Sequence, residues 1–185
     1  FSSGGASYAD DSKNTTLCVS IKEEDHKVNE SISLGLGKSH LSSSDIFNSH
    51  KITNYLLSAR EKKQAKKNDF DDALIINEKN MVVETTSGNF FWIKGANVFT
   101  PSLETGALDG ITRSLVLEVC KKNKIRVIEG EFEPGSIIFP EAMFVTNSAR
   151  GIIEVVNLNN TTQPTRTKKI FPTIRAEVLE MLDWS

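Results

Sequence analysis

Lys51 is the first residue of this chain whose surroundings suggest chemistry. It stands in the segment HKITNYL, where a polar loop gives way to the apolar residues Ile52, Tyr55 and Leu56 at the start of an expected helix. Burial disfavours the ammonium form of a lysine, so a partly desolvated amine has a lowered pKa and can act as a nucleophile or a base. On position alone, an ordinary surface lysine is the alternative.

The turn GALDGIT, residues 106–112, is the second candidate, because it leads into a helix-like segment. The first N–H groups of a helix have no partner within the helix and, with the helix dipole, favour an anion. Ile111 and Thr112 would supply these N–H groups and a hydroxyl. An ordinary helix start capped by the carboxylate of Asp109 is the alternative.

Polar residues also follow two expected strands. Thr146, Asn147 and Ser148 come directly after AMFV, and Glu84 ends MVVE ahead of the polar run TTSGN. Hydroxyls and an amide at the end of a strand can line a ligand site, or they can simply cap a turn. The Glu84 carboxylate is either solvated or paired with a buried cation.

The cysteines and histidines do not suggest a metal site. Cys18 and Cys120 lie in apolar stretches without CxxC spacing, so we expect two buried, reduced thiols rather than a disulfide or a nucleophile. His26, His40 and His50 lie in polar stretches without the spacing of metal ligands. We therefore expect no bound metal.

The composition is that of a folded soluble domain, with 185 residues, 38% hydrophobic, 25% charged and a net charge of -2. This near-neutral balance argues against a nucleic-acid binder, and the stretch 60–67, REKKQAKK, lacks interleaved aromatic residues, which favours a solvated helix face. No apolar run approaches the roughly 20 residues that span a bilayer. The length predicts one domain or slightly more.

Short strands and three helices are expected to position these residues. Strands are expected at residues 17–21, from about 31, and at 73–76, 81–84, 89–93, 97–100, 125–128, 143–146 and 151–156, with a hairpin turn at 77–80. Helical spacing predicts apolar faces formed by Ile52, Leu56 and Ala59, by Ile111, Leu115 and Val119, and by Ile170, Ile174, Val178 and Leu182. Consecutive short strands followed by a helix indicate a mixed sheet or barrel rather than a bundle.

Taken in order, these segments resemble the large domain of the class IV aminotransferases, pyridoxal-phosphate enzymes of fold type IV. The matching motifs are HKITNYL, the Glu-(x)4-Asn-(apolar)2 block, the Thr-Pro-x-Leu turn, the Gly-Ile-Thr-Arg helix start and EAMFVTNSARGI. The resemblance implies a mixed α/β fold with the large pseudo-barrel cofactor domain of the D-amino-acid aminotransferase-like type at residues 17–185. Residues 1–16 would be the remnant of an interdomain linker, with the family's small N-terminal domain absent from this chain.

The resemblance also implies a role for each candidate residue. Lys51 matches the lysine that attaches pyridoxal 5'-phosphate and then moves a proton. Glu84 matches the carboxylate that faces the pyridine nitrogen, where an anion favours the protonated ring, the better electron sink. Ile111 and Thr112 match the helix N-terminus that holds the cofactor phosphate, and Ser148 matches a hydroxyl that adds a further bond to it.

A resemblance to one group of enzymes within the family indicates the reaction. The run TNSARG is most similar to 4-amino-4-deoxychorismate lyases, which form 4-aminobenzoate and pyruvate for folate synthesis. Asn147 and Arg150 would then be the nearest candidates for contacting substrate carboxylates, the arginine because its guanidinium fork matches them. A branched-chain or D-amino-acid aminotransferase, and a non-catalytic truncated module of the same fold, are the alternatives.

Tyr55 stays without a role, although it lies near the position where some members place a tyrosine on the cofactor's phenolic oxygen, because the loop after Lys51 is shorter here than in the branched-chain enzymes. The family further implies a small-molecule substrate and a homodimer with cofactor sites near the interface. The charge balance and the lack of a long apolar run predict no nucleic-acid or membrane partner, and the reduced cysteines predict a cytoplasmic location.

Overall fold

The computed structural model describes residues 31–162 and 169–183, together with residues 2–3, 15–16, Val19 and Ile21. The short strands β1 (Ser2–Ser3) and β2 (Thr15–Thr16) pair antiparallel. Most of the expected linker at residues 1–16, most of the expected strand at 17–21, Cys18 and His26 lie outside the described residues.

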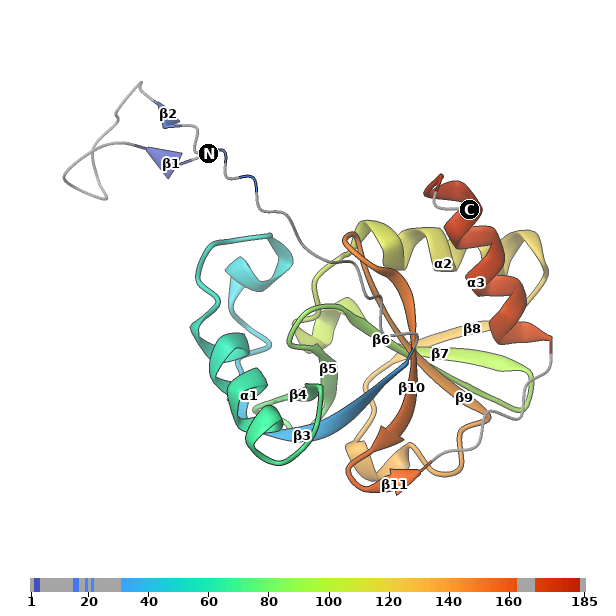
Figure 1. Cartoon of the computed structure of the whole chain (residues 1–185), viewed down its shortest axis with the longest axis horizontal. Coiled ribbons are helices and arrows are strands. Elements are labelled where there is room, and N and C mark those ends of the chain that lie inside the picture. The colour runs from blue at the N-terminus through green and yellow to red at the C-terminus, as the bar shows by residue number, and fades with distance from the viewer. Residues whose placement is uncertain are drawn as a thin grey trace.

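A single curled, mixed sheet carries the rest of the fold (Figure 1). Its strand order is β5-β4-β3-β10-β9-β6-β7-β8, and β11 pairs with β10. The strands are β3 (Ser31–Leu41), β4 (Asp72–Asn77), β5 (Val82–Thr85), β6 (Asn89–Lys94), β7 (Asn97–Pro101), β8 (Val127–Gly130), β9 (Ala142–Asn147), β10 (Gly151–Leu158) and β11 (Thr161–Thr162). Parallel pairing joins β10 to β3, β3 to β4 and β7 to β8, while the other pairs are antiparallel. The expected mixed α/β fold is confirmed.

Three α-helices and three short 3-10 helices complete the described structure. They are η1 (Ile46–Ser49), α1 (Leu56–Lys67), η2 (Leu103–Thr105), α2 (Ile111–Lys122), η3 (Pro134–Ser136) and α3 (Ile170–Met181). Helices α2 and α3 lie together on one side of the sheet, and α1 lies beside β3 and β4 (Figure 1). None of the helices that the structure describes combines the length and hydropathy needed to cross a membrane.

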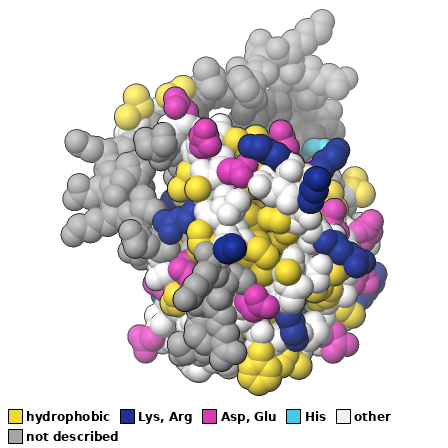
Figure 2. Space-filling model, turned by 90° about the vertical axis from the view of Figure 1, so that its right-hand side faces the viewer, with side chains coloured by type: hydrophobic (Ala, Val, Ile, Leu, Met, Phe, Trp, Pro, Cys, Tyr) yellow, Lys and Arg dark blue, Asp and Glu magenta, His cyan; other side chains and the backbone are white. Residues whose placement is uncertain are grey.

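Two apolar clusters form the core, one on each face of the sheet. The first packs Phe91 and Phe144, whose rings stack with centroids 5.0 Å apart, against α2 and α3. The second packs Leu34, Phe90 and Trp92 on the other face. Both clusters follow from the strand pattern, because successive side chains of a buried strand point to opposite faces. On the outside, positive and negative side chains are interspersed over the face seen in Figure 2.

Local turn chemistry explains where the strands begin and end. The hairpin expected at residues 77–80 is present, with the N–H of Asn80 donating to the carbonyl of Asn77 at 2.9 Å. Strand β8 begins at Val127 rather than at Ile125, because the N–H of Ile125 still closes the end of α2 by donating to the carbonyl of Cys120 at 2.8 Å. Lys124 adopts the left-handed conformation that this helix ending requires.

The apolar face expected for the first helix is wrong. Helix α1 begins at Leu56, so Ile52 lies in the preceding loop, and Leu56 itself is 77% exposed. The residues of α1 that are buried are Glu61 and Ala65. Burial of a glutamate is unusual unless its carboxylate is hydrogen-bonded. The partners of Glu61 lie on a neighbouring strand.

Glu61 ties α1 to β3. Its carboxylate accepts hydrogen bonds from the backbone N–H of Lys38 at 2.8 Å and from the hydroxyl of Ser39 at 2.6 Å. Burial raises the pKa of Glu61, but these hydrogen bonds outweigh that effect and leave the pKa below its ordinary value. The strand thus fixes the helix through a charged side chain rather than an apolar stripe.

Replacing Glu61 by alanine is expected to lower the free energy of unfolding by about 2 kcal/mol, because hydrogen bonds to a buried carboxylate are lost although alanine is the better helix former. Urea denaturation measures the change. Lys63→Ala, on the exposed face of the same helix, is the matched control and should change stability little. Equal effects of the two substitutions would contradict the role given to Glu61.

The expected face of the second helix is confirmed for Val119 and Leu115, which belong to the core or pack against it, and is wrong for Ile111. Ile111 is 72% exposed, while Thr112, Val116 and Val119 form the buried stripe together with Cys120. The third helix buries Ile174 and Val178, with Ile170 and Leu182 partly buried, so its expected face is confirmed.

Candidate active site

A cavity of about 480 Å³ gathers segments that are far apart in the sequence. Its walls come from residues 47–58, 84–89, 108–112 and 146–148. Six predicted site residues line it, namely Lys51, Glu84, Ile111, Thr112, Asn147 and Ser148. Arg150 is not among the lining residues. The structure therefore brings together all but one of the residues singled out from the sequence.

Strand pairing explains why these segments meet. Strand β6 pairs with β9 so that Asn89 lies opposite Thr146. The turn between β5 and β6 consequently lies beside the end of β9, and a Cβ on Gly88 would collide with the carbonyl oxygen of Thr146. The amide of Asn89 donates to the carbonyl of Leu108 at 2.7 Å, which fixes the segment before α2 against the same strands.

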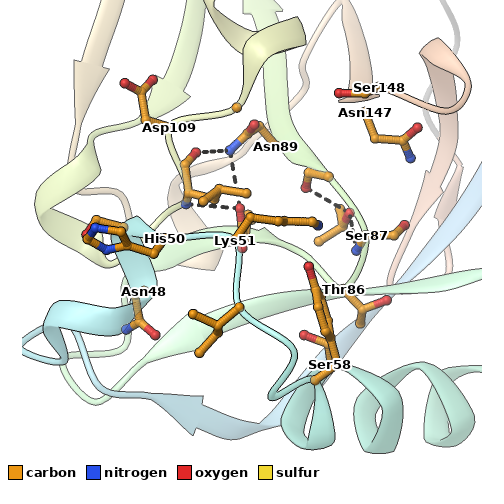
Figure 3. A pocket seen from close by; sticks show the side chains of 18 of the residues that line it. Asn48, His50, Lys51, Ser58, Thr86, Ser87, Asn89, Asp109, Asn147 and Ser148 are labelled. Atoms are coloured by element: carbon orange, nitrogen blue, oxygen red, sulfur yellow. Dashed lines mark hydrogen bonds between the residues drawn. The ribbon is translucent and has the colours of Figure 1, made fainter. Parts of the chain in front are cut away.

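Lys51 lies on the loop between η1 and α1 and is exposed, as in the alternative of an ordinary surface lysine. Its Nζ lies 4.8 Å from the centroid of the Tyr55 ring. A cation over an aromatic face is attracted by the ring quadrupole. Tyr55, which received no role from the sequence, therefore belongs to the site. In Figure 3, Lys51 occupies the middle of the pocket, with Asn89 and Ser58 on opposite sides.

Glu84 is partly buried near the end of β5. One of its carboxylate oxygens accepts hydrogen bonds from the N–H of Leu108 and from the amide of Asn89, both at 3.2 Å. Burial raises the pKa of Glu84 to about 7, although the Leu108 N–H and the charge of Lys51 act in the opposite direction. The carboxylate is thus held in place and is ready to be stabilised by a positive group.

The start of α2 lacks a side-chain cap. Gly110 is the N-cap residue, and the alternative in which Asp109 caps the helix is wrong. Asp109 instead lies 3.7 Å from the guanidinium of Arg113. The hydroxyl of Thr112 is buried and has no hydrogen-bond partner among the described residues. Uncapped N–H groups and an unpaired hydroxyl together fit an anion.

Asn147 closes the turn between β9 and β10. Its Oδ1 accepts from the N–H groups of Ala149 at 3.1 Å and Arg150 at 2.8 Å. The turn-cap alternative is therefore confirmed for this oxygen, while the side chain still borders the cavity beside Ser148 (Figure 3). The contact of Arg150 with a substrate carboxylate stays a prediction.

A buried carboxylate that the sequence did not single out fixes the turn opposite Lys51. Asp72 is 2% exposed and accepts hydrogen bonds from the hydroxyls of Thr86 and Ser87. Thr86 and Ser87 both line the cavity. The excess of hydroxyls in TTSGN was the available signal, but their partner lies 14 residues earlier at the start of β4.

Of the cysteines and histidines, the structure describes Cys120, His40 and His50. Cys120 is fully buried and burial raises the pKa of its thiol to about 11, which confirms it as an inert core thiol. His40 is exposed on β3, and His50 is exposed at the edge of the cavity. Within residues 31–162 and 169–183, no three His, Cys, Asp or Glu side chains gather in a way that could hold a metal ion.

Comparison with known proteins agrees with this geometry. The family model of amino-transferase class IV matches residues 1–158. An aminodeoxychorismate lyase of Vibrio harveyi is 28% identical over 128 residues, covering 69% of this chain and 47% of the relative. A putative branched-chain-amino-acid aminotransferase of Methanocaldococcus jannaschii is 32% identical over 109 residues, covering 59% of this chain and 38% of the relative. The chain thus spans half or less of the length of these two relatives.

Solved structures show the same fold. A putative 4-amino-4-deoxychorismate lyase from Legionella pneumophila superposes with a TM-score of 0.74 at 29% identity, covering 91% of this chain and 59% of that one. A T.th. branched-chain amino acid aminotransferase, solved with pyridoxamine 5'-phosphate, gives a TM-score of 0.76 at 21% identity, covering 86% and 54%. The curled sheet, the order of the site segments and the family match lead to one conclusion: the chain belongs to the class IV aminotransferase family.

Proposed function

We propose that this chain is the cofactor-binding part of a pyridoxal 5'-phosphate enzyme that converts 4-amino-4-deoxychorismate to 4-aminobenzoate and pyruvate. One arrangement carries the proposal: an amine at Lys51, a carboxylate at Glu84 and an uncapped helix start at Ile111 and Thr112 share one cavity. An amine, an anion and an anion-binding helix end are the three groups that an aldehyde, a ring nitrogen and a phosphate require.

The polar side chains that line the cavity fit this cofactor. The hydroxyl of Thr112 is buried without a partner, and a phosphate oxygen would satisfy it. Burial raises the pKa of Glu84 to about 7, and a positive charge brought beside it would favour its ionised form. When bound, the cofactor supplies an electron sink for negative charge that develops at the substrate carbon.

Each of these residues would have its own role toward the cofactor or the substrate. Lys51 Nζ would hold the cofactor and then take and return a proton. Glu84 would keep negative charge at the ring nitrogen. The N-terminus of α2, with Thr112 and Ser148, would bind the phosphate. Asn147 and Arg150 would be the nearest candidates for recognising substrate carboxylates.

The lyase activity rests on the run TNSARG and on the likeness to the lyases of Vibrio harveyi and Legionella pneumophila. Relatives named as branched-chain aminotransferases match at similar identity, so an aminotransferase on the same scaffold is the second candidate. These two activities differ in the fate of the amino group, which makes them separable by their products.

A product assay tests the proposal. The chain reconstituted with pyridoxal 5'-phosphate is incubated with 4-amino-4-deoxychorismate and, separately, with branched-chain amino acids and 2-oxoglutarate. We expect 4-aminobenzoate and pyruvate in the first reaction and no glutamate in the second. Glutamate without 4-aminobenzoate would replace the lyase by an aminotransferase, and cofactor binding without either product would favour a non-catalytic module.

Homodimerisation and a cytoplasmic location are part of the same proposal. The dimer is supported by apolar side chains beside the cavity that the described residues leave exposed. These are Ile46, Phe47, Leu56 and Ile111, with exposed fractions of 75%, 58%, 77% and 72%. Exposed apolar groups of this kind mark interaction surfaces, and a second copy of the chain would cover them.

A further inference from the structure

A second buried hydroxyl in the cavity wall has no assigned role. Thr146 is 1% exposed, and its Oγ1 has no hydrogen-bond partner among the residues that the structure describes. Buried polar groups in folded proteins are nearly always hydrogen-bonded, so an unpaired hydroxyl calls for a partner that the chain itself does not supply. Thr146 lines the same cavity as Thr112, whose hydroxyl is unpaired as well.

The strand pairing places the Thr146 side chain on the side of α2. Thr146 lies opposite Asn89, and side chains of directly opposed residues share one face of the sheet. The Asn89 side chain is directed at the segment before α2, because it donates to the carbonyl of Leu108 and because a Cβ on Gly110 would collide with its Oδ1. Two residues before Thr146 on the same face, Phe144 packs in the cluster that α2 and α3 cover.

We infer that the Thr146 hydroxyl donates a further hydrogen bond to the cofactor phosphate at the start of α2, which rests on the proposed function. The N-terminus of α2 attracts an anion, and the hydroxyls of Thr112 and Thr146 reach that end from a helix and from a strand. An anion with several acceptor oxygens can pair both hydroxyls at once. Thr146 is more deeply buried than Ser148, which places it at the inner wall of the phosphate site rather than at its rim.

Thr146→Val, which removes the hydroxyl and keeps the shape, tests the inference. Binding is measured as the fraction of Lys51 trapped by borohydride at increasing concentrations of pyridoxal 5'-phosphate or of pyridoxal, which lacks the phosphate. We expect the affinity for pyridoxal 5'-phosphate to fall about tenfold, as for the loss of a hydrogen bond to a charged group, and the affinity for pyridoxal to stay unchanged. Thr146→Ser, which keeps the hydroxyl, should restore most of the binding.

Thermal unfolding of the cofactor-free chain supplies a second readout. Removing an unpaired hydroxyl takes away no hydrogen bond, so Thr146→Val should leave the unfolding midpoint unchanged or raise it. Thr100→Val is the matched control: Thr100 is 1% exposed on β7, outside the cavity, and its hydroxyl donates to the carbonyl of Phe90 at 2.9 Å. That substitution should lower the midpoint and leave cofactor affinity within about twofold of wild type.

The possible results separate this inference from the proposed function. Unchanged affinity of Thr146→Val for pyridoxal 5'-phosphate would overturn the inference and leave the proposed function intact. An equal loss of affinity for pyridoxal would also overturn it, because the contact would then not be to the phosphate. Failure of the wild-type chain to bind pyridoxal 5'-phosphate would overturn the proposed function and the inference together.

Discussion

Replacing Lys51 by alanine is expected to abolish the covalent trapping of pyridoxal 5'-phosphate by borohydride and to lower turnover by at least about 10³-fold. The side chain is the amine of the cavity, and its Nζ lies over the Tyr55 ring and close enough to Glu84 to act on that carboxyl. One substitution therefore removes both the attachment point and the group that moves the proton. Peptide mass spectrometry after borohydride reduction measures the first effect, and product formation measures the second.

Lys79→Ala is the matched control for this substitution. Lys79 is exposed in the turn between β4 and β5 and does not line the cavity. The control should be trapped at Lys51 and turn over like the wild-type chain. Trapping of the Lys51→Ala chain at another lysine with wild-type turnover would show that Lys51 is not the attachment site.

Glu84→Gln is expected to lower turnover by about 10²-fold, because the amide keeps the shape but no longer places a negative charge at the ring nitrogen. It should also change the pH dependence of folding. Burial raises the pKa of Glu84 from 4.5 to about 7. Between these two pH values the native chain therefore holds a proton that the unfolded chain has already released.

The sign of the pH effect follows from that proton. The contribution of protonated Glu84 to the free energy of unfolding is complete below about pH 4.5 and is lost as the pH rises through about 7. Across this window the free energy of unfolding falls by about 3 kcal/mol. Glutamine has no proton to lose, so the substitution should flatten this part of the stability profile of the cofactor-free chain. Urea denaturation at a series of pH values measures it.

Glu131→Gln serves as the control, because Glu131 is exposed after β8 and outside the cavity. Its profile should follow that of the wild-type chain. If the wild-type chain gains stability between pH 4.5 and 7, or if Glu84→Gln keeps the wild-type slope, the protonation assigned to Glu84 is wrong.

The strands were predictable because their signals are local. The Asn77–Asn80 turn and the alternation in the run SISLGLG can be read within a few residues, and the structure places a turn at the first and β3 at the second. Helix faces depend on partners elsewhere in the chain. The burial of Glu61 depends on β3, and the burial of Arg113 depends on the carboxylate of Glu129 and the carbonyl of Pro101. Hydropathy alone places both charged residues on the outside.

For the site as well, local motifs predicted one part of the arrangement and contacts between distant segments determine the rest. The motifs predicted which residue types meet in the cavity, and the structure brings Lys51, Glu84 and Thr112 together. The motifs do not show whether each side chain is exposed, hydrogen-bonded or unpaired. The exposure of Lys51, the use of Asn147 Oδ1 in a turn and the unpaired hydroxyl of Thr146 all depend on distances between segments.

The place of β10 in the sheet has a consequence for synthesis on the ribosome. This strand lies between β3, which begins more than a hundred residues earlier, and β9, and so joins the part of the sheet that carries Glu84 to the part that carries Ser148. Because a nascent chain folds from its N-terminus while later strands are still inside the tunnel, β3 can pair early with β4, but its other edge stays open until β10 has emerged. Cofactor capture therefore has to follow the emergence of β10, and the open edge of β3 needs protection from aggregation until then.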